Sequence, residues 1–213
     1  MAIVRKGETL SGTVGQVVLY EIYGKKAMRT LPTGVRKINS TKVKKAQSNF
    51  AFVMSLMQMF KEHITIGYGE AAYRRSAFQE AMSANLANYN NALREQKAEG
   101  LAWLTLSKGR LSGAGELHAE LNIPNRLTII WQDTQPDLAF RDDDIVMLSV
   151  ATTDKAYSHV NTHAATRRDG IIELDLPAEA VGKELYAFIT FKRAEGKGKI
   201  FTVSNSQGVM IGE

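Results

Sequence analysis

Apolar and β-branched residues near the start of the chain predict a β-hairpin. Residues 16–23 (QVVLYEIY) are rich in side chains that favour extended backbone. Gly24-Lys25 stands where a tight turn would, and residues 26–31 can return as a second strand. Pro32 and Gly34 then end the hairpin. Residues 35–39 are expected to be extended and to lead into a helix.

A helix is predicted from residue 43 to residue 60, with Ser40 or Thr41 as its N-cap. Its apolar residues recur at steps of three and four, a helical stripe formed by Val43, Ala46, Phe50, Val53, Met57 and Phe60. Phe52, Leu56 and Met59 widen the stripe until little of the second half is polar. Such a helix must be covered on more than one side. It is either the central core helix or a helix with one face docked on another subunit.

A second helix is predicted after Gly67 and Gly69. Ser76 and Gln79 have the spacing of a capping box, which satisfies two free backbone N–H groups at a helix start. Apolar residues follow at steps of four, four, three and four, namely Phe78, Met82, Leu86, Tyr89 and Leu93. The helix is expected to end near Gly100, and the two helices to form an antiparallel pair.

The pattern changes after Gly100 to short apolar runs separated by Gly, Pro, Asp and Asn. Seven strands are predicted, over residues 101–106, 116–121, 127–132, 144–152, 170–176, 184–191 and 199–204. Strands without intervening helices favour an antiparallel β-sandwich. The predicted class is therefore α+β, with residues 1–100 forming a hairpin, basic arm and helical pair and residues 101–213 forming the sandwich. Trp131 on an inner strand and Tyr186 resemble the core aromatic residues of immunoglobulin-like and fibronectin type III-like modules.

Several short motifs resemble those of an uncharacterised bacterial family, a domain of unknown function abundant in Bacteroidetes-type genomes. The first is GTVGQVVLYEIYGKKAMRTLP, with Gly15, Val18, Tyr20, Gly24, Lys25, Arg29 and Pro32, followed by Lys37 and Gln47. The remainder are Ser107, Gly109, Leu111, Trp131, the segment AATRRDG, Leu176-Pro177 and VSNSQGVMIG. The resemblance covers nearly the whole chain. It implies a C-terminal immunoglobulin-like sandwich and no particular activity.

Charge is unevenly distributed along the 213 residues. The net charge of +5 combines thirteen Lys and Arg against four acidic residues in residues 1–75 with fourteen against eighteen in residues 76–213. From Ile22 to Lys61, both included, there are nine basic residues and no acidic one. The basic N-terminal third is expected to meet an anionic partner, or the acidic part of another copy of the chain.

Candidate chemistry is sparse. The chain has no cysteine, which excludes disulfides, thiolate metal sites and cysteine nucleophiles. His159 and His163 are four residues apart, but they are expected in a surface loop without a third ligand. The run Asp142 to Asp144 lacks the alternating ligands of a calcium loop and is predicted to be a solvated strand entry. No phosphate loop or nucleophile elbow is present. We therefore expect no enzyme, no cofactor, no metal and no small-molecule substrate.

The basic arm is the only functional signal. Its candidate anion-binding residues are Lys25, Lys26, Arg29, Arg36, Lys37, Lys42, Lys44 and Lys45. They could follow a phosphate backbone with strongly salt-dependent affinity, or remain a solvated surface, or pair with an acidic patch such as residues 142–144 of a neighbour. Residues 36–45 contain no aromatic side chain for base stacking, so sequence-specific binding to single strands is not expected.

Two main functional hypotheses remain open, besides a third option, a sandwich domain that binds a partner protein or a glycan. The first is a non-enzymatic structural protein that forms homo-oligomers, including a phage-like or other particle subunit, through the basic arm and the helix residues Phe50, Val53, Met57 and Phe60. The alternative is a sequence-nonspecific nucleic-acid-binding module that uses residues 25–45. No stretch has the length of a signal h-region or a membrane span. The expected location is the cytoplasm, or a particle assembled there.

Overall fold

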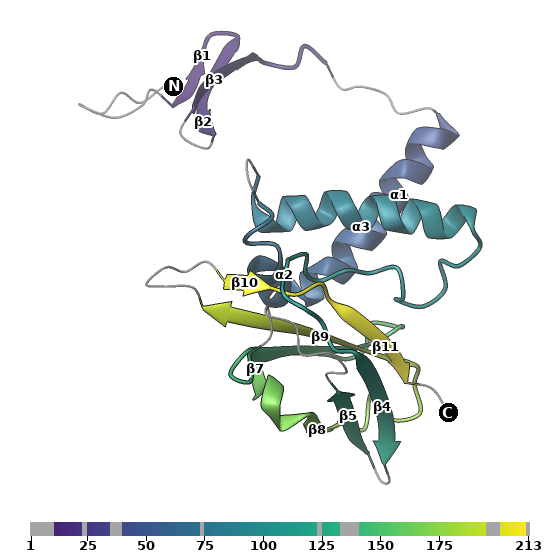
Figure 1. Ribbon diagram of the computed structural model, residues 1–213. Coiled ribbons are helices and arrows are strands. Elements are labelled where there is room, and N and C mark those ends of the chain that lie inside the picture. The colour runs from purple at the N-terminus through teal and green to yellow at the C-terminus, as the bar shows by residue number, and fades with distance from the viewer. Residues whose placement is uncertain are drawn as a thin grey trace. The chain divides into compact units, whose positions relative to one another are not determined.

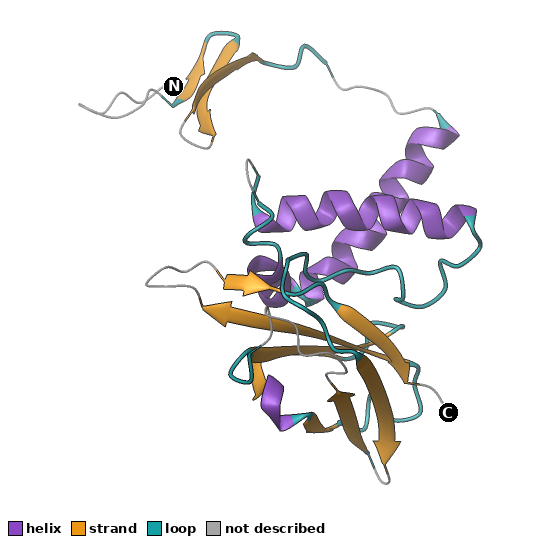
Figure 2. Ribbon diagram, in the orientation of Figure 1, coloured by secondary structure: helices purple, strands orange, loops and turns teal. Residues whose placement is uncertain are grey.

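The computed structural model describes residues 11–22, 25–34, 40–72, 75–122, 125–132, 141–194 and 201–211. Its helices and strands are drawn in Figure 1 and separated by type in Figure 2. The chain divides into two compact units, Met1–Ala46 and Gln47–Glu213. The helix α1 (Thr41–Met59) contains the residues at which they divide.

The first unit holds a three-stranded antiparallel sheet, here called the β-meander. Its strands are β1 (Gly12–Val14), β2 (Val17–Ile22) and β3 (Lys25–Thr30), in the order β1-β2-β3. The pairing of β2 with β3 confirms the predicted hairpin. Tyr23 and Gly24, where its turn was expected, lie outside the described residues, as do residues 35–39, which were expected to be extended.

The described residues contain three helices where two were predicted. The predicted first helix is divided at Phe60 into α1 and the short α2 (Lys61–Gly67). The third, α3 (Ala77–Arg94), begins with the predicted capping box: Gln79 N donates to Ser76 Oγ at 3.2 Å, and Ser76 N donates to Gln79 Oε1 at 3.1 Å. In the part of the chain that the structure describes, no helix is both long and apolar enough to cross a membrane.

The second unit contains two antiparallel sheets. The larger has the order β10-β9-β6-β7, with β11 also paired to β9, and the smaller has the order β4-β5-β8. The strands are β4 (Glu116–Asn122), β5 (Arg126–Gln132), β6 (Ile145–Thr152), β7 (Ser158–Thr166), β8 (Ile171–Asp175), β9 (Leu185–Ala194), β10 (Phe201–Val203) and β11 (Gln207–Ile211). A 3₁₀ turn, Arg167–Asp169, joins β7 to β8.

The larger sheet lies between two hydrophobic cores. On one side Phe188 of β9 packs with Phe60, Leu56 and other helix residues. On the other side Phe191 of β9 packs with Trp131 and its neighbours on the smaller sheet. Figure 1 shows the resulting layers of the second unit: helices, larger sheet, smaller sheet. Because both its faces are covered, β9 is buried along eight of its ten residues.

The strand predictions after residue 100 were mostly right, but the strand over residues 101–106 is not observed, and two observed strands, β7 and β11, were not predicted. Residues 101–106, predicted as a strand, form a buried loop, in which Asn85 of α3 accepts from Thr105 N at 2.7 Å and donates to Thr105 O at 2.8 Å. The side-chain amide of Asn85 thus makes the hydrogen bonds to the backbone of Thr105 that a neighbouring strand would otherwise make. Conversely, residues 158–166, expected to contain a surface loop, form strand β7.

The observed division of the chain differs from the expected one at residue 100. Helix residues Val53 and Ile64 lie in the same core as Ala151 and Tyr186 of the larger sheet. The helices after residue 46 therefore belong to one compact unit with the sheets. The class is α+β, with three helices and mostly antiparallel sheets.

Candidate functional site

The predicted basic arm begins on the exposed strand β3. Lys25, Lys26 and Arg29 are all exposed. Because strand side chains alternate, Lys25 and Arg29 lie on one face of the β-meander and Lys26 lies on the other. Lys26 is the cross-strand partner of Glu21, whereas Lys25 and Arg29 are opposite the apolar residues Ile22 and Val18. Lys25 and Arg29 therefore have no acidic cross-strand partner. The face of the sheet that these two residues share is here called the Lys25 face.

The arm continues at the start of α1. Lys42, Lys44 and Lys45 are exposed in its first turns, and the first turn contains no acidic residue. Positive charge is unfavourable at a helix N-terminus, by a few tenths of a kcal/mol for each exposed side chain. Arg36 and Lys37, also predicted to bind anions, lie outside the described residues.

The apolar stripe of α1 is covered over only half its length. Val53, Met57 and Phe60 are fully buried in the chain's own core. Phe50 and Val43 lie on the same stripe towards the N-terminus, and they remain 43% and 44% exposed. Of the four predicted assembly residues, three thus fill the intramolecular core. Of these four residues, only Phe50 is exposed.

The β-meander has no buried core among its described residues. None of residues 11–22 and 25–34 is buried. Its apolar side chains are exposed on both faces, with Tyr20 and Ile22 on the Lys25 face and Val14 and Met28 on the other. Met28 is 75% exposed. A sheet of three strands needs a buried apolar face for independent stability, and no described residue of this sheet is buried.

His63 of α2 is a buried polar residue that the sequence patterns did not single out. Its side chain lies between the hydroxyls of Ser149 and Thr190, at 2.7 Å from Nδ1 and 2.9 Å from Nε2. Burial, with a smaller contribution from the cation of Lys192, lowers the pKa of His63 to about 3. All three hydrogen-bonded residues are fully buried, so no substrate can reach them. The arrangement fixes α2 on the larger sheet. The only sign of its burial in the sequence was its position three residues after Phe60 and four before Gly67, a spacing that places all three residues on the same side of a helix.

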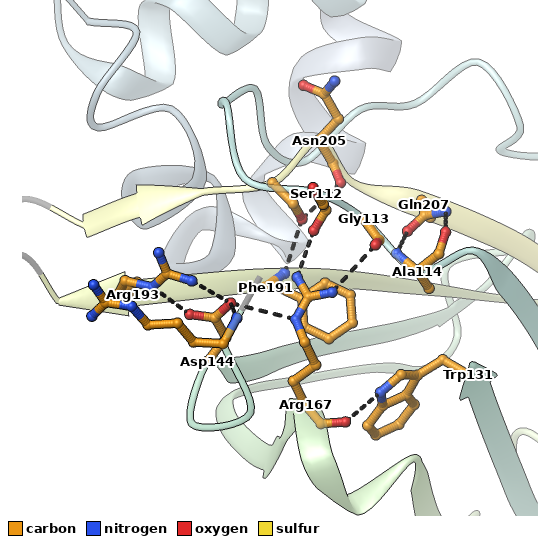
Figure 3. A network of polar contacts seen from close by, with 12 residues as sticks. Ser112, Gly113, Ala114, Trp131, Asp144, Arg167, Phe191, Arg193, Asn205 and Gln207 are labelled. Carbon is orange, nitrogen blue, oxygen red and sulfur yellow. Dashed lines mark hydrogen bonds and ion pairs between the residues drawn. The ribbon is translucent and has the colours of Figure 1, made fainter. Parts of the chain in front are cut away.

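Asp144 was predicted to be a solvated strand entry, and this was wrong. Its carboxylate is buried and accepts hydrogen bonds from Arg193, at 2.6 Å from Nε to Oδ1 and 2.8 Å from Nη2 to Oδ2. The Nε of Arg167 lies 3.4 Å from Oδ2 (Figure 3). Asp144 therefore cannot serve as an acidic patch for a neighbouring copy.

Arg167 extends this network into the core between the two sheets. Its guanidinium donates to Ser112 O at 2.5 Å and to Gly113 O at 3.3 Å, and it stacks on the Phe191 ring at 3.6 Å. Its own carbonyl accepts from Trp131 Nε1 at 2.9 Å (Figure 3). Because the network joins the loop before β4 to both sheets, it is a structural clamp.

The candidate metal residues do not form a site. His159 and His163 lie on strand β7, not in the expected loop. Four residues along a strand correspond to about 13 Å, too far for both to bind one ion. His163 Nε2 lies 3.1 Å from Lys192 Nζ. Among the described residues, no cluster of three or more His, Asp or Glu side chains could hold a metal.

These features define an α+β protein whose polar clusters are internal and whose unusual surfaces are an uncovered sheet and a half-covered helix. The chain belongs to a family of unknown function, DUF6266, whose family model matches residues 9–209. No curated protein matches it.

Proposed function

We propose that this protein is a non-enzymatic structural protein that assembles into homo-oligomers through its N-terminal region. The interface would comprise the β-meander, the basic arm and the N-terminal half of α1. Assembly would take place in the cytoplasm. A role as a subunit of a phage-like or other particle fits this kind of protein by analogy only.

The observation that carries this proposal is the uncovered β-meander. A sheet with exposed apolar residues on both faces gains from burying them, at about 25 cal/mol for each Å² removed from water. Exposed Ile22 and Met28 therefore mark a surface that a partner would cover. Val43 and Phe50 add a second apolar surface of the same kind on α1.

The charge distribution supports a second copy of the chain as the partner. The first 75 residues carry nine more basic than acidic residues, and the remaining 138 carry four more acidic than basic residues. Opposite net charges on two parts of one chain favour contacts between copies and speed their encounter.

The experiment is light scattering of the purified full chain over a wide concentration range. We expect the mean mass to rise with concentration and the double variant Ile22→Ser/Phe50→Ser to remain monomeric at concentrations where the wild type associates. Leu93→Ser is the matched control, since Leu93 is an exposed apolar residue of α3 outside the proposed surface. A wild type that stays monomeric at high concentration and low salt would overturn the proposal.

We also infer that the two sheets form an immunoglobulin-like sandwich of the fibronectin type III kind. The strand order supports this: β4, β5 and β8 correspond to strands A, B and E of such a module, and the larger sheet corresponds to strands C′, C, F and G. Buried Trp131 on β5 and the shared core between the sheets agree with it. An experimental structure whose two sheets failed to face each other would refute this assignment.

The alternative function is sequence-nonspecific binding of nucleic acid by the basic arm. It is favoured by six exposed cations, Lys25, Lys26, Arg29, Lys42, Lys44 and Lys45, in a region with a single described acidic residue, Glu21. Fluorescence anisotropy with a labelled DNA duplex would test it. If about six phosphates are engaged, affinity should fall by roughly three orders of magnitude between 50 and 200 mM salt. Lys42→Glu/Lys44→Glu/Lys45→Glu should weaken binding equally for all sequences, and an absence of binding at low salt would refute the alternative.

A further inference from the structure

The smaller sheet has an outward face that its strand register defines. Residues of β4, β5 and β8 whose side chains point away from the core form three rows across the sheet. These rows are His118–Ile130–Ile171, Glu120–Thr128–Glu173 and Asn122–Arg126–Asp175. Glu116, opposite Gln132, lies beyond the first row. The alternate residues, such as Ile129 and Ile172, point into the core.

This outward face is acidic around an apolar centre. Glu116, Glu120, Glu173 and Asp175 are all exposed. Among the described residues of this face, Arg126 is the only Lys or Arg, and it pairs with Asp175 at 2.8 Å and with Glu173 at 3.3 Å. Ile130 on the middle strand is half-buried, and Ile171 beside it on the edge strand β8 is 45% exposed. Glu116 lies 3.9 Å from Nε2 of His118, and its side chain is still 57% exposed. Both glutamates of β4 are therefore accessible to a further cation.

The Lys25 face of the β-meander has the complementary arrangement. Lys25 and Arg29 are exposed at either end of β3, and apolar Tyr20 and Ile22 lie beside them on β2. This face has no acidic residue among its described positions, because Glu21 points to the opposite side. It is a basic face with an apolar centre.

The spacing of charges on the two faces also matches. Lys25 and Arg29 are four residues apart on one strand, about 13 Å along it. Glu116 and Glu120 are four residues apart on another strand, again about 13 Å. Two sheets packed face to face lie about 10 Å apart, a separation that Lys and Arg side chains can span to reach a carboxylate.

From these matched faces, we propose that the Lys25 face of the β-meander of one copy docks on the outward face of β4, β5 and β8 of a second copy. The proposal rests on the homo-oligomer function proposed above and names the surface that the β-meander meets. Tyr20 and Ile22 would cover Ile130 and Ile171, while Lys25 and Arg29 would pair with Glu116 and Glu120.

This contact joins two different surfaces, so it is heterologous. A heterologous contact leaves each copy with one donor and one acceptor surface, and both are satisfied by a reciprocal pair, a closed ring or an open filament. The interface is charged, so association should weaken as salt increases.

The test is a charge exchange between two variants of the full chain, treated with nuclease and measured by light scattering. The acceptor variant is Glu116→Lys/Glu120→Lys, and the donor variant is Lys25→Glu/Arg29→Glu. Alone, each should require about tenfold more protein or higher to reach the mean mass of the wild type, because like charges would face each other. An equimolar mixture should regain association, since each variant supplies the surface that the other lacks.

Matched controls carry the same charge changes elsewhere. Glu95→Lys/Glu99→Lys and Lys61→Glu/Lys108→Glu alter exposed residues outside both faces and should associate like the wild type. Melting temperatures of all variants are compared first. If a charge-reversed variant is unstable, the corresponding neutral variant, Glu116→Gln/Glu120→Gln or Lys25→Gln/Arg29→Gln, is used instead. We expect the neutral variants to weaken association in the same direction but by a smaller factor.

The outcomes separate the two proposals. If the wild type associates but the charge variants associate equally well, or their mixture is not restored, the docking surface is wrong and homo-oligomerisation stands. If the wild type is monomeric, or associates only when nucleic acid is present, both proposals fail.

Discussion

Arg167 and Asp144 form an ion pair from which water is excluded: both side chains are fully buried, and Arg167 Nε lies 3.4 Å from Asp144 Oδ2. Removing two charges from water is costly, and the cost is recovered only when further hydrogen bonds satisfy both groups. Here Arg193 donates two hydrogen bonds to the carboxylate, and the carbonyl oxygens of Gly113 and Ser112 accept from Nη1 and Nη2 of Arg167. The pair joins the turn after β7 to the entry of β6.

Asp144→Ala should therefore be strongly destabilising. The variant leaves the buried Arg167 cation without its carboxylate, and losses of about 3–5 kcal/mol are typical of such a change. Denaturant unfolding at neutral pH measures the loss. The control is Asp175→Ala, which removes an exposed ion pair with Arg126 and should cost under about 1 kcal/mol. Equal losses in the two variants would contradict the structural role assigned to Asp144.

His63 should make stability depend on pH. In the unfolded chain its pKa is near 6.5, whereas in the folded protein burial lowers the pKa to about 3. Between these values the unfolded chain binds a proton that the folded protein does not. The contribution of His63 to the free energy of unfolding is therefore complete above pH 6.5. As the pH is lowered towards 3, the free energy of unfolding falls by about 1.4 kcal/mol for each pH unit.

The measurement for His63 is denaturant unfolding at pH 7.5 and pH 5, compared between the wild type and His63→Gln. The variant should be less stable at pH 7.5 and should lose less stability on acidification, because it lacks the titrating group. His118→Gln, at a histidine whose side chain is 69% exposed, should retain the wild-type pH dependence. If His63→Gln retained it too, the assignment to His63 would be incorrect.

The sequence predicted well those elements whose signal is local. The capping box at Ser76 and Gln79 depends on two residues three positions apart, and the structure confirms it. The hairpin and most strands were also found, because alternating apolar residues are read directly from neighbours in the chain.

Features that depend on distant partners were missed. Residues 101–106 have the apolar pattern of a strand, but Asn85 of α3 satisfies Thr105 and no neighbouring strand is needed. Asp144 stands in a run of three acids, and only the fold brings Arg167 and Arg193 to it. Similarly, Val53 and Phe50 belong to one apolar stripe, and the sequence cannot tell where the core ends along it.

Gly109 should be intolerant of a side chain. A Cβ at this position would lie 2.0 Å from the backbone oxygen of Val203, which cannot move without disturbing the bond that Leu111 N donates to the same oxygen. Gly109→Ala should therefore cost about 1–3 kcal/mol, as overpacking commonly does. Thermal unfolding measures this, with Gly34→Ala as the control, because a Cβ on Gly34 meets nothing within 4 Å. A Gly109→Ala variant as stable as the wild type would show that the close approach to Val203 is absent.

The same substitution, Val to Ala, at two positions of the apolar stripe of α1 distinguishes a role in folding from a role in assembly. Val53 is fully buried and Val43 is 44% exposed. Val53→Ala leaves a cavity in the core and should lower the free energy of unfolding by about 2 kcal/mol. Val43 belongs to neither hydrophobic core, and Val43→Ala exchanges a β-branched residue for the best helix former. The free energy of unfolding at low concentration should therefore change by less than about 0.5 kcal/mol.

The two substitutions should affect association in the opposite order. If the exposed half of the stripe docks on another copy, Val43→Ala reduces the mean mass in light scattering at concentrations where Val53→Ala, while still folded, does not. Because the two variants remove the same two methyl groups, side-chain chemistry cannot account for the difference, and only position along α1 can. Equal association of Val43→Ala and wild type would remove Val43 from the proposed interface and leave Phe50 and the β-meander as its apolar surfaces.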